Sequence, residues 1–277
     1  MMAQPINPEL IPYKEWLDSQ EKSKITVAKY LRDVDKFRQF FNKSLSSLTK
    51  QDIIAYKDYL ASQYKPISVN SYLISLNRFF SFLDQEGLRV KTLKIQHKTS
   101  LNNVLTEDDY NALISTARKT NKLRIYYIIR VLASSGIRIG ELQYITVDML
   151  KTGKTQVCGK NKTREIIIPN KLCMELQQYC QTRNIQQVIF HGEKPDTLID
   201  KAAIWRELKQ LAKSAGVPLE KVHAHNFRHF FAKTFLAHYH DIVDLADILG
   251  HHSIETTRIY TRTSGNEKQN RINALNL

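Results

Sequence analysis

Residues 225–260 read HNFRHFFAKTFLAHYHDIVDLADILGHHSIETTRIY, and the predicted fold and chemistry of the whole chain depend on this stretch. It places His225 and Arg228 one helical turn apart, and it continues through an amphipathic helix to His251 and Tyr260. An arginine can hold a phosphate through two parallel hydrogen bonds, a histidine can transfer a proton near neutral pH, and a tyrosine can act as a covalent nucleophile. This combination of side chains indicates chemistry on a phosphodiester.

The charge of the chain indicates a polyanionic partner. The 277 residues include 41 Lys and Arg against 27 Asp and Glu, a net charge of +14. Residues 1–103 hold 16 basic and 10 acidic residues, a net of +6, so the remainder carries +8. A strongly basic protein most often binds nucleic acid, whereas a charge that served only solubility would more often be acidic. Both halves of the chain are therefore expected to contact the same DNA.

Several other classes of protein are disfavoured by the sequence. There is no apolar signal core and no apolar run of about 18 residues, so we expect a cytoplasmic protein without membrane contact. Cys158, Cys173 and Cys180 form no C-x-x-C pair and are expected to be reduced thiols. The paired histidines lack a cysteine or carboxylate at a zinc-ligand spacing, and no glycine-rich phosphate loop occurs. A zinc site and nucleotide hydrolysis are therefore disfavoured.

The first part of the chain, residues 10–86, is predicted to form a bundle of four short helices. Thr49, or Ser47 just before it, can cap the third helix, and Pro66 and Gly87 mark the start and the end of the fourth. The second helix has one apolar face, formed by residues at three- and four-residue steps: Val27, Leu31, Val34, and Phe37 or Phe41.

A second domain is predicted after a basic linker at residues 88–103, which has no helical periodicity. Thr106 begins a helix with a capping-box pattern. The apolar residues 125–132 then predict a buried helix that breaks at Gly136. The chain therefore divides into a helical first part and a second part in which the chemical motifs lie.

Arg138 and Glu141 come directly after this break, three residues apart on one face of a resumed helix. An arginine next to a buried segment is costly unless it pairs with a carboxylate or binds an anion. Taken alone, the pair fits a structural ion pair as well as it fits part of a phosphate site.

Residues 155–169, TQVCGKNKTREIIIP, predict a β-hairpin that turns at GKNK. Lys160 and Lys162 lie at its tip. A lysine in such a place is usually only a solvated charge. A mobile ammonium group at a hairpin tip can nevertheless reach a leaving-group oxygen and protonate it.

Four motifs in this order carry a family resemblance: SGIRIGEL at 135–142, GKNKTREIIIP at 159–169, HNFRH at 225–229 and LGHHSIETTRIY at 249–260. With them, the whole chain resembles the tyrosine recombinases, the family of phage-type integrases and Xer recombinases. The resemblance implies a mainly α fold with a small antiparallel β-sheet. It also implies three parts: a four-helix, SAM-like core-binding domain at residues 1–88, a linker at residues 89–103, and an α+β catalytic domain with a C-terminal tail at residues 104–277.

The resemblance implies six catalytic residues, drawn from the four motifs: Arg138, Lys160, His225, Arg228, His251 and Tyr260. The two arginines would hold the scissile phosphate, the lysine and the last histidine would assist, the first histidine would help in proton transfer, and the tyrosine would be the nucleophile. Glu141 would steady the first arginine, and His229 would be structural. Because GKNK lacks the second glycine of the family pattern GKGxK, Lys160 and Lys162 both stay candidates for the hairpin acid. No metal and no cofactor is implied.

The implied activity is site-specific recombination of DNA through a 3′-phosphotyrosyl intermediate, either for integration and excision of a mobile element or for Xer-type dimer resolution. The implied partners are double-stranded DNA, further copies of the chain in a tetrameric synapse, and an accessory DNA-bending protein. The tail, with Ile272, Leu275 and Leu277, would dock on a neighbouring subunit, and the other interpretation is a frayed terminus. Two other functions stay open: a type IB topoisomerase-like enzyme and a catalytically inactive DNA-binding protein.

Overall fold

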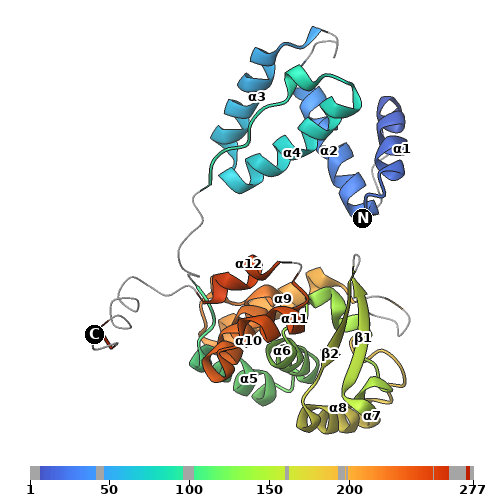
Figure 1. Cartoon of the computed structure of the whole chain (residues 1–277). Helices are drawn as coiled ribbons and strands as arrows, with labels where there is room; N and C mark the ends of the chain where they lie inside the picture. The colour runs from blue at the N-terminus through green and yellow to red at the C-terminus, as the bar shows by residue number, and fades with distance from the viewer. Residues whose placement is uncertain are drawn as a thin grey trace. The chain divides into compact units, whose positions relative to one another are not determined.

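The computed structural model of the chain divides into two compact units, Met1–His97 and Lys98–Leu277, each of which is described by itself (Figure 1). The structure describes residues 7–41, 47–95, 103–159, 162–192, 197, 199–251, 253–261 and 273–274, and the side chains at 159 and 162 are not included. In this part of the chain, no helix is long and apolar enough to cross a membrane.

The first unit is a bundle of four helices, as predicted. The helices are α1 (Ile11–Ser19), α2 (Lys24–Phe40), α3 (Lys50–Gln63) and α4 (Pro66–Phe82), with single 3-10 turns at Pro8–Leu10 and Glu86–Leu88. Thr49 caps α3 in a full capping box with Asp52, and Pro66 occupies the first turn of α4. The predicted caps and the buried face of α2 are therefore confirmed, with Phe37 rather than Phe41 in the core.

The predicted end of the fourth helix was wrong. Helix α4 ends at Phe82, and Gly87 lies in the following 3-10 turn. Asp84 takes the left-handed backbone conformation, with φ of 55°, that a glycine was expected to supply. An aspartate tolerates this conformation better than most residues because its short polar side chain can bond locally. The glycine was therefore not needed to end the helix.

The beginning of the predicted linker is fixed to the first unit by two asparagine side chains. Asn77 accepts from the backbone N–H of Val90 at 2.9 Å and donates to its carbonyl at 2.8 Å. Asn70 bonds both backbone groups of Leu93 in the same way, at 2.7 and 2.9 Å. The side chain of Val90 is buried in the helical core. Residues 89–95 therefore pack as part of the first unit.

The second unit is mainly helical with one small antiparallel sheet, which confirms the predicted fold class (Figure 1). Its elements are α5 (Glu107–Lys119), α6 (Leu123–Ser135), η4 (Ile139–Tyr144), α7 (Met149–Thr152), β1 (Lys154–Gly159), β2 (Lys162–Ile167), α8 (Asn170–Arg183), α9 (Lys201–Ala215), η5 (Leu219–Lys221), α10 (Ala224–Tyr239), α11 (Ile242–Leu249), α12 (Ile254–Thr257) and η6 (Arg258–Tyr260).

Helix α6 lies in the core of this unit and packs against α5 and α10. It ends at Gly136, as predicted, with φ of 62°. A Cβ at this position would lie 2.5 Å from Phe231 and 2.8 Å from Leu249, so the site needs glycine both for its backbone and for its close packing. Arg138 and Glu141 do not resume an α-helix, since Ile139–Tyr144 forms a tighter 3-10 helix instead.

Strands β1 and β2 form the predicted hairpin. They pair in a regular register from Lys154 with Ile167 to Gly159 with Lys162, which leaves residues 160–161 as the connection. Lys160 lies outside the described residues, and so does the side chain of Lys162. The described strands define the base of the hairpin.

Candidate active site

Arg228 is the best-buried charged side chain of the second unit, at 1% exposure, and it connects the ends of two helices. Its Nη1 donates to the carbonyl of Gly136 after α6, and its Nη2 donates to the carbonyl of Leu249 at the end of α11, both at 2.7 Å. The last carbonyls of a helix lack intrahelical donors and carry partial negative charge. These two helix ends therefore stabilise a guanidinium group that burial would otherwise disfavour.

The pKa of Arg228 falls to about 10, chiefly because of desolvation and then because of the charge of Arg138. The side chain thus keeps its charge at neutral pH. Its hydrogen bonds to the two carbonyls and to His251 use three of the five N–H groups that a guanidinium carries. The site therefore contains a fixed cation with donor capacity left for a ligand.

His251 contacts Arg228 directly, and the contact defines its tautomer. Its Nε2 lies 2.9 Å from Arg228 Nη2, and its Nδ1 lies 2.7 Å from Thr257 Oγ1. A guanidinium can only donate, so Nε2 accepts and the ring proton lies on Nδ1, which donates to the threonine. Burial, followed by the charges of Arg228 and Arg138, lowers the pKa of His251 to about 4. His251 is therefore neutral at physiological pH.

Tyr260 lies in the short helix η6, is 7% exposed, and faces two histidines. Its hydroxyl oxygen is 3.0 Å from His229 Nδ1, and its ring is nearly parallel to that of His251, with centroids 6.4 Å apart. Burial raises the pKa of Tyr260, although the charge and hydrogen bonding of Arg228 and the charge of Arg138 act in the opposite direction. The phenol is therefore protonated at neutral pH, beside a cation that favours its anion.

The histidine that contacts the phenol is His229, whereas His225 is the one expected to help in proton transfer. His229, expected to be structural, makes this contact, and His225 has no hydrogen bond to Tyr260 among the described residues. The two rings lie 4.3 Å apart, with His225 on the exposed side. Burial and the neighbouring His225 lower the pKa of His229 to about 4, so its ring is neutral and its Nδ1 can accept a hydrogen bond from the phenol. The spacing of four residues on one helix was the signal that could have identified it.

Arg138 is supported differently from Arg228, because half of its side chain is exposed. Glu141 Oε2 accepts from the backbone N–H of Arg138 at 2.7 Å, and Oε1 pairs with its Nη1 at 3.3 Å. The charge of Arg138 contributes to lowering the pKa of Arg228 and of His251, which places it near both. The predicted pairing of Arg138 with Glu141 is therefore present.

A second arginine on Glu141 was not predicted. Arg164 of β2 donates to Glu141 Oε2 and also to the carbonyl of Ile248, at 2.6 Å. No local pattern in the sequence indicates this arginine, because its contacts with Glu141 and Ile248 span 23 and 84 residues.

The tail residues Ile272, Leu275 and Leu277 lie outside the described residues. Within the described ranges, no three of His, Cys, Asp and Glu come together as a metal site would need.

The site groups two arginines, a buried tyrosine and histidines on a helical domain that carries a β-hairpin. This set of groups defines a tyrosine recombinase. Residues 103–267 match the phage integrase family, and residues 10–87 match the N-terminal SAM-like domain of phage integrases. The chain belongs to this family.

Individual relatives agree with this assignment. The tyrosine recombinase XerA of Pyrococcus furiosus is 30% identical over 275 residues, which cover 96% of this chain and 93% of that one. A crystal structure of XerA recombinase is 28% identical, with a TM-score of 0.52 and coverage of 97% and 98%. The fold is also shared with a lambda integrase tetramer bound to a Holliday junction, at 17% identity, a TM-score of 0.73 and coverage of 92% and 78%.

The chain is thus a tyrosine-type site-specific recombinase, an enzyme that breaks and rejoins DNA. Its relatives do not favour the two other functions that the sequence left open, a type IB topoisomerase-like enzyme and an inactive DNA-binding protein.

Proposed function

We propose that Tyr260 cleaves the scissile phosphodiester of a specific double-stranded DNA site. The phenol oxygen forms a bond to phosphorus while the bond from phosphorus to the 5′ oxygen breaks, which gives a 3′-phosphotyrosyl link and a free 5′ hydroxyl. A 5′ hydroxyl of the partner strand reverses the step. The observation that carries the proposal is that Tyr260 lies 3.0 Å from a neutral imidazole and within the electrostatic influence of both arginines.

The phenol needs a proton acceptor, because burial raises its pKa above the ordinary value of about 10. In this proposal, His229 Nδ1 accepts the phenolic proton as the tyrosine attacks. His225, whose ring lies 4.3 Å from that of His229 on the exposed side, connects His229 to solvent. The role first assigned to His225 is thereby divided between two histidines on one face of α10.

The two arginines would stabilise the negative charge that develops on the nonbridging oxygens. Arg228 is fixed before DNA arrives, and Arg138 is half exposed and able to close on a phosphate. Such donors act where charge develops in the transition state, and the loss of one typically costs about 10²- to 10³-fold in rate. In this proposal the arginines supply the electrostatic stabilisation of the scissile phosphate, and His251 assists by orienting Arg228 through their hydrogen bond.

The leaving 5′ oxygen needs a proton, and the proposed donor is a lysine of the β1–β2 hairpin. Lys160 is assigned this role by its motif, and Lys162 is the second candidate. The hairpin supports the assignment because Arg164 fixes β2, the strand that follows the lysine motif, to the site. Protonation of the 5′ oxygen converts an alkoxide leaving group into an alcohol.

We further propose that four copies act together on two DNA sites, with the tail of each docked on a neighbour. The fold shared with a lambda integrase tetramer on a Holliday junction supports this assembly. The net charge of +14, divided between both units, supports a grip on DNA from both of them. An accessory DNA-bending protein, a mobile-element role and Xer-type dimer resolution are all compatible with the same chemistry.

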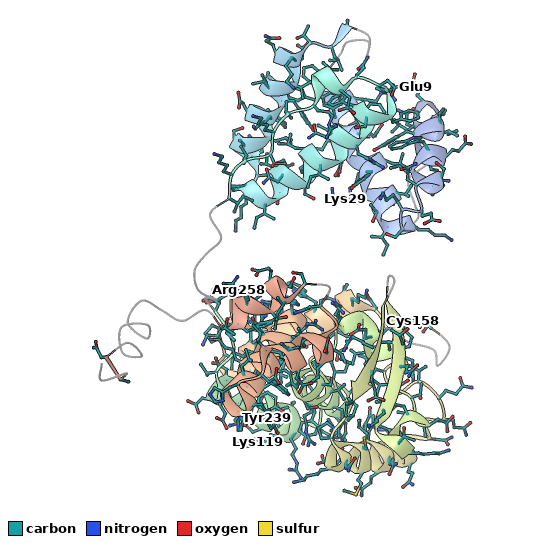
Figure 2. The ribbon with its side chains drawn as sticks, viewed as in Figure 1. Glu9, Lys29, Lys119, Cys158, Tyr239 and Arg258 are labelled. Atoms are coloured by element: carbon teal, nitrogen blue, oxygen red, sulfur yellow. The ribbon has the colours of Figure 1, made fainter. Side chains whose placement is uncertain are left out.

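The test of the proposal begins with DNA sites selected from a randomised duplex library by the purified protein. A nicked version of a selected site, which cannot be religated, should trap a covalent protein–DNA complex in EDTA. Tyr260→Phe should form none, whereas the control Tyr239→Phe, at the exposed far end of α10, should react normally (Figure 2). A covalent complex with Tyr260→Phe would disprove the assignment of the nucleophile.

A further inference from the structure

We infer that Arg164 is a positioning residue for the recombination reaction: it fixes the two phosphate-binding arginines relative to each other and to strand β2 of the hairpin. The inference rests on the proposed function. Arg164 lies on β2, and its side chain is only 9% exposed. Its two terminal nitrogens donate to groups on two other segments, namely the Glu141 carboxylate and the carbonyl of Ile248. One guanidinium thus connects three segments of the site.

On the first segment, Arg164 acts through Glu141. The same carboxylate accepts from the backbone N–H and from the side chain of Arg138, so one group orients both the main chain and the guanidinium of that arginine. Arg164 donates to Glu141 Oε2, the same oxygen that accepts from the backbone N–H of Arg138. Without Arg164, the carboxylate would lose its buried partner and would be held from the side of Arg138 alone. The position of Arg138 therefore depends on a residue that need not touch DNA.

On the second segment, Arg164 acts through the end of α11. The carbonyl of Ile248 is one residue before that of Leu249, which accepts from Arg228. The side chain of Arg164 also crosses the backbone of Gly250, where an added Cβ would lie 2.3 Å from Arg164 Cδ. His251 follows immediately. The helix end that holds Arg228 and the loop that presents His251 are therefore both packed against Arg164.

On the third segment, Arg164 is part of the hairpin itself. It pairs in register with Val157, and Lys162 lies two residues closer to the turn. An arginine suits this position because its planar group presents several donors in fixed directions, whereas a lysine is a single mobile charge. A substitution that keeps the charge but removes the fork should therefore restore the contact with only one of the two acceptors.

The experiment measures single-turnover cleavage of the nicked DNA at saturating protein, together with DNA affinity and the thermal midpoint. We expect Arg164→Gln to cleave about 10²-fold more slowly, with DNA affinity changed less than about 3-fold, since the side chain is only 9% exposed and bonded within its own unit. Arg164→Lys should fall between this variant and the wild type. The control is Arg130→Gln, which breaks a part-buried pair with Glu175 in the same unit and should lose stability without slowing cleavage.

A double-mutant cycle separates positioning from general destabilisation. If Arg164 acts through Glu141, the rate losses of Arg164→Gln and Glu141→Gln should be clearly less than additive, because the second change removes a group already displaced. Additive losses would overturn the inference, and so would normal cleavage by both Arg164 variants. Where Arg164→Gln does not fold, the cycle is run with Arg164→Lys. Absence of any Tyr260-dependent complex with the wild type would instead remove the proposed function itself.

Discussion

Arg228 and Arg138, which we propose to hold the same phosphate, are supported in opposite ways. Arg228 is 1% exposed and donates to two helix-end carbonyls and to His251. Arg138 is half exposed and is steadied by a single carboxylate. The first arginine is part of the packing of the unit, and the second is a surface group placed beside it.

The difference separates stability from catalysis. A buried guanidinium whose donors are satisfied by carbonyls is preorganised, but its removal leaves those carbonyls without partners. An exposed ion pair contributes little to stability, so its removal should affect only the reaction. The predictions below test this contrast, beginning with the largest expected effect.

Arg228→Ala should abolish detectable cleavage and also destabilise the second unit. Three hydrogen bonds are lost and two helix-end carbonyls are left buried, which should cost roughly 3 kcal/mol of unfolding free energy. Denaturant unfolding and single-turnover cleavage measure the two effects. Wild-type stability in this variant would show that the arginine is not structural.

Arg138→Ala should lower single-turnover cleavage by about 10²- to 10³-fold while changing the unfolding free energy by less than about 0.5 kcal/mol. DNA binding should be retained, because one of many phosphate contacts is lost. The measurement pairs a filter-binding or mobility assay with the cleavage rate. Lost binding combined with normal cleavage at saturating protein would contradict the proposed role.

Gly250→Ala should disturb the contacts that hold Arg228 and those that hold Arg138, because Arg164 packs against both sets. Gly250 and Gly216 both end helices in the left-handed conformation, at φ of 63° and 68°, but only Gly250 has a side chain packed on it. Gly216→Ala is therefore a matched control for backbone strain, at about 1–2 kcal/mol. Gly250→Ala should lose more stability than this control and should also slow cleavage. Equal effects of the two substitutions on both measurements would show that the contact with Arg164 is unimportant.

The stability of the second unit should also depend on pH, through the histidines His229 and His251. The pKa values of His229 and His251 are about 4 in the folded protein and about 6.5 when unfolded, so the unfolded state binds more protons between these values. Stability should be full above pH 6.5 and should fall as the pH drops toward 4. Unfolding at pH 7 and pH 5 should differ by on the order of 3–4 kcal/mol, about half of it from each histidine. His229→Gln and His251→Gln should each reduce the difference, and an unchanged difference in both would contradict the assignment.

The smallest expected effect is on the salt dependence of DNA binding. A protein that neutralises several phosphates should lose affinity steeply with salt, because counterions are released on binding. Arg138→Ala should reduce the slope of log K against log salt by about one unit. Arg130→Gln is the control, since its guanidinium is already paired with Glu175. A flat dependence in the wild type would argue against a DNA-binding role for the excess charge.

Local signals predicted most of the fold. Thr49 and Thr106 cap their helices, and Gly136 ends its helix, because these residues act within one helical turn. The end of α4 was wrong because Asp84 adopts a backbone conformation that glycine usually supplies.

The site was predicted where a motif carried it and missed where only tertiary packing did. Arg138, Arg228, His251 and Tyr260 lie in three of the four short motifs. His229 lies inside one of these motifs and Arg164 inside another, yet their partners are 31 and 84 residues away. A pattern of residues gives no information about which neighbour a buried side chain will meet across the core.

Arg228 bonds to the ends of both α6 and α11, and this affects how inactive relatives of the enzyme can be recognised from their sequences. A lineage that no longer recombines DNA can discard Arg138 at little cost to folding, because half of that side chain is exposed, but it cannot discard Arg228 without weakening the attachment of two helices. Retention of Arg228 in a related sequence is therefore poor proof of activity. Loss of the exposed arginine is the more informative sign of lost activity.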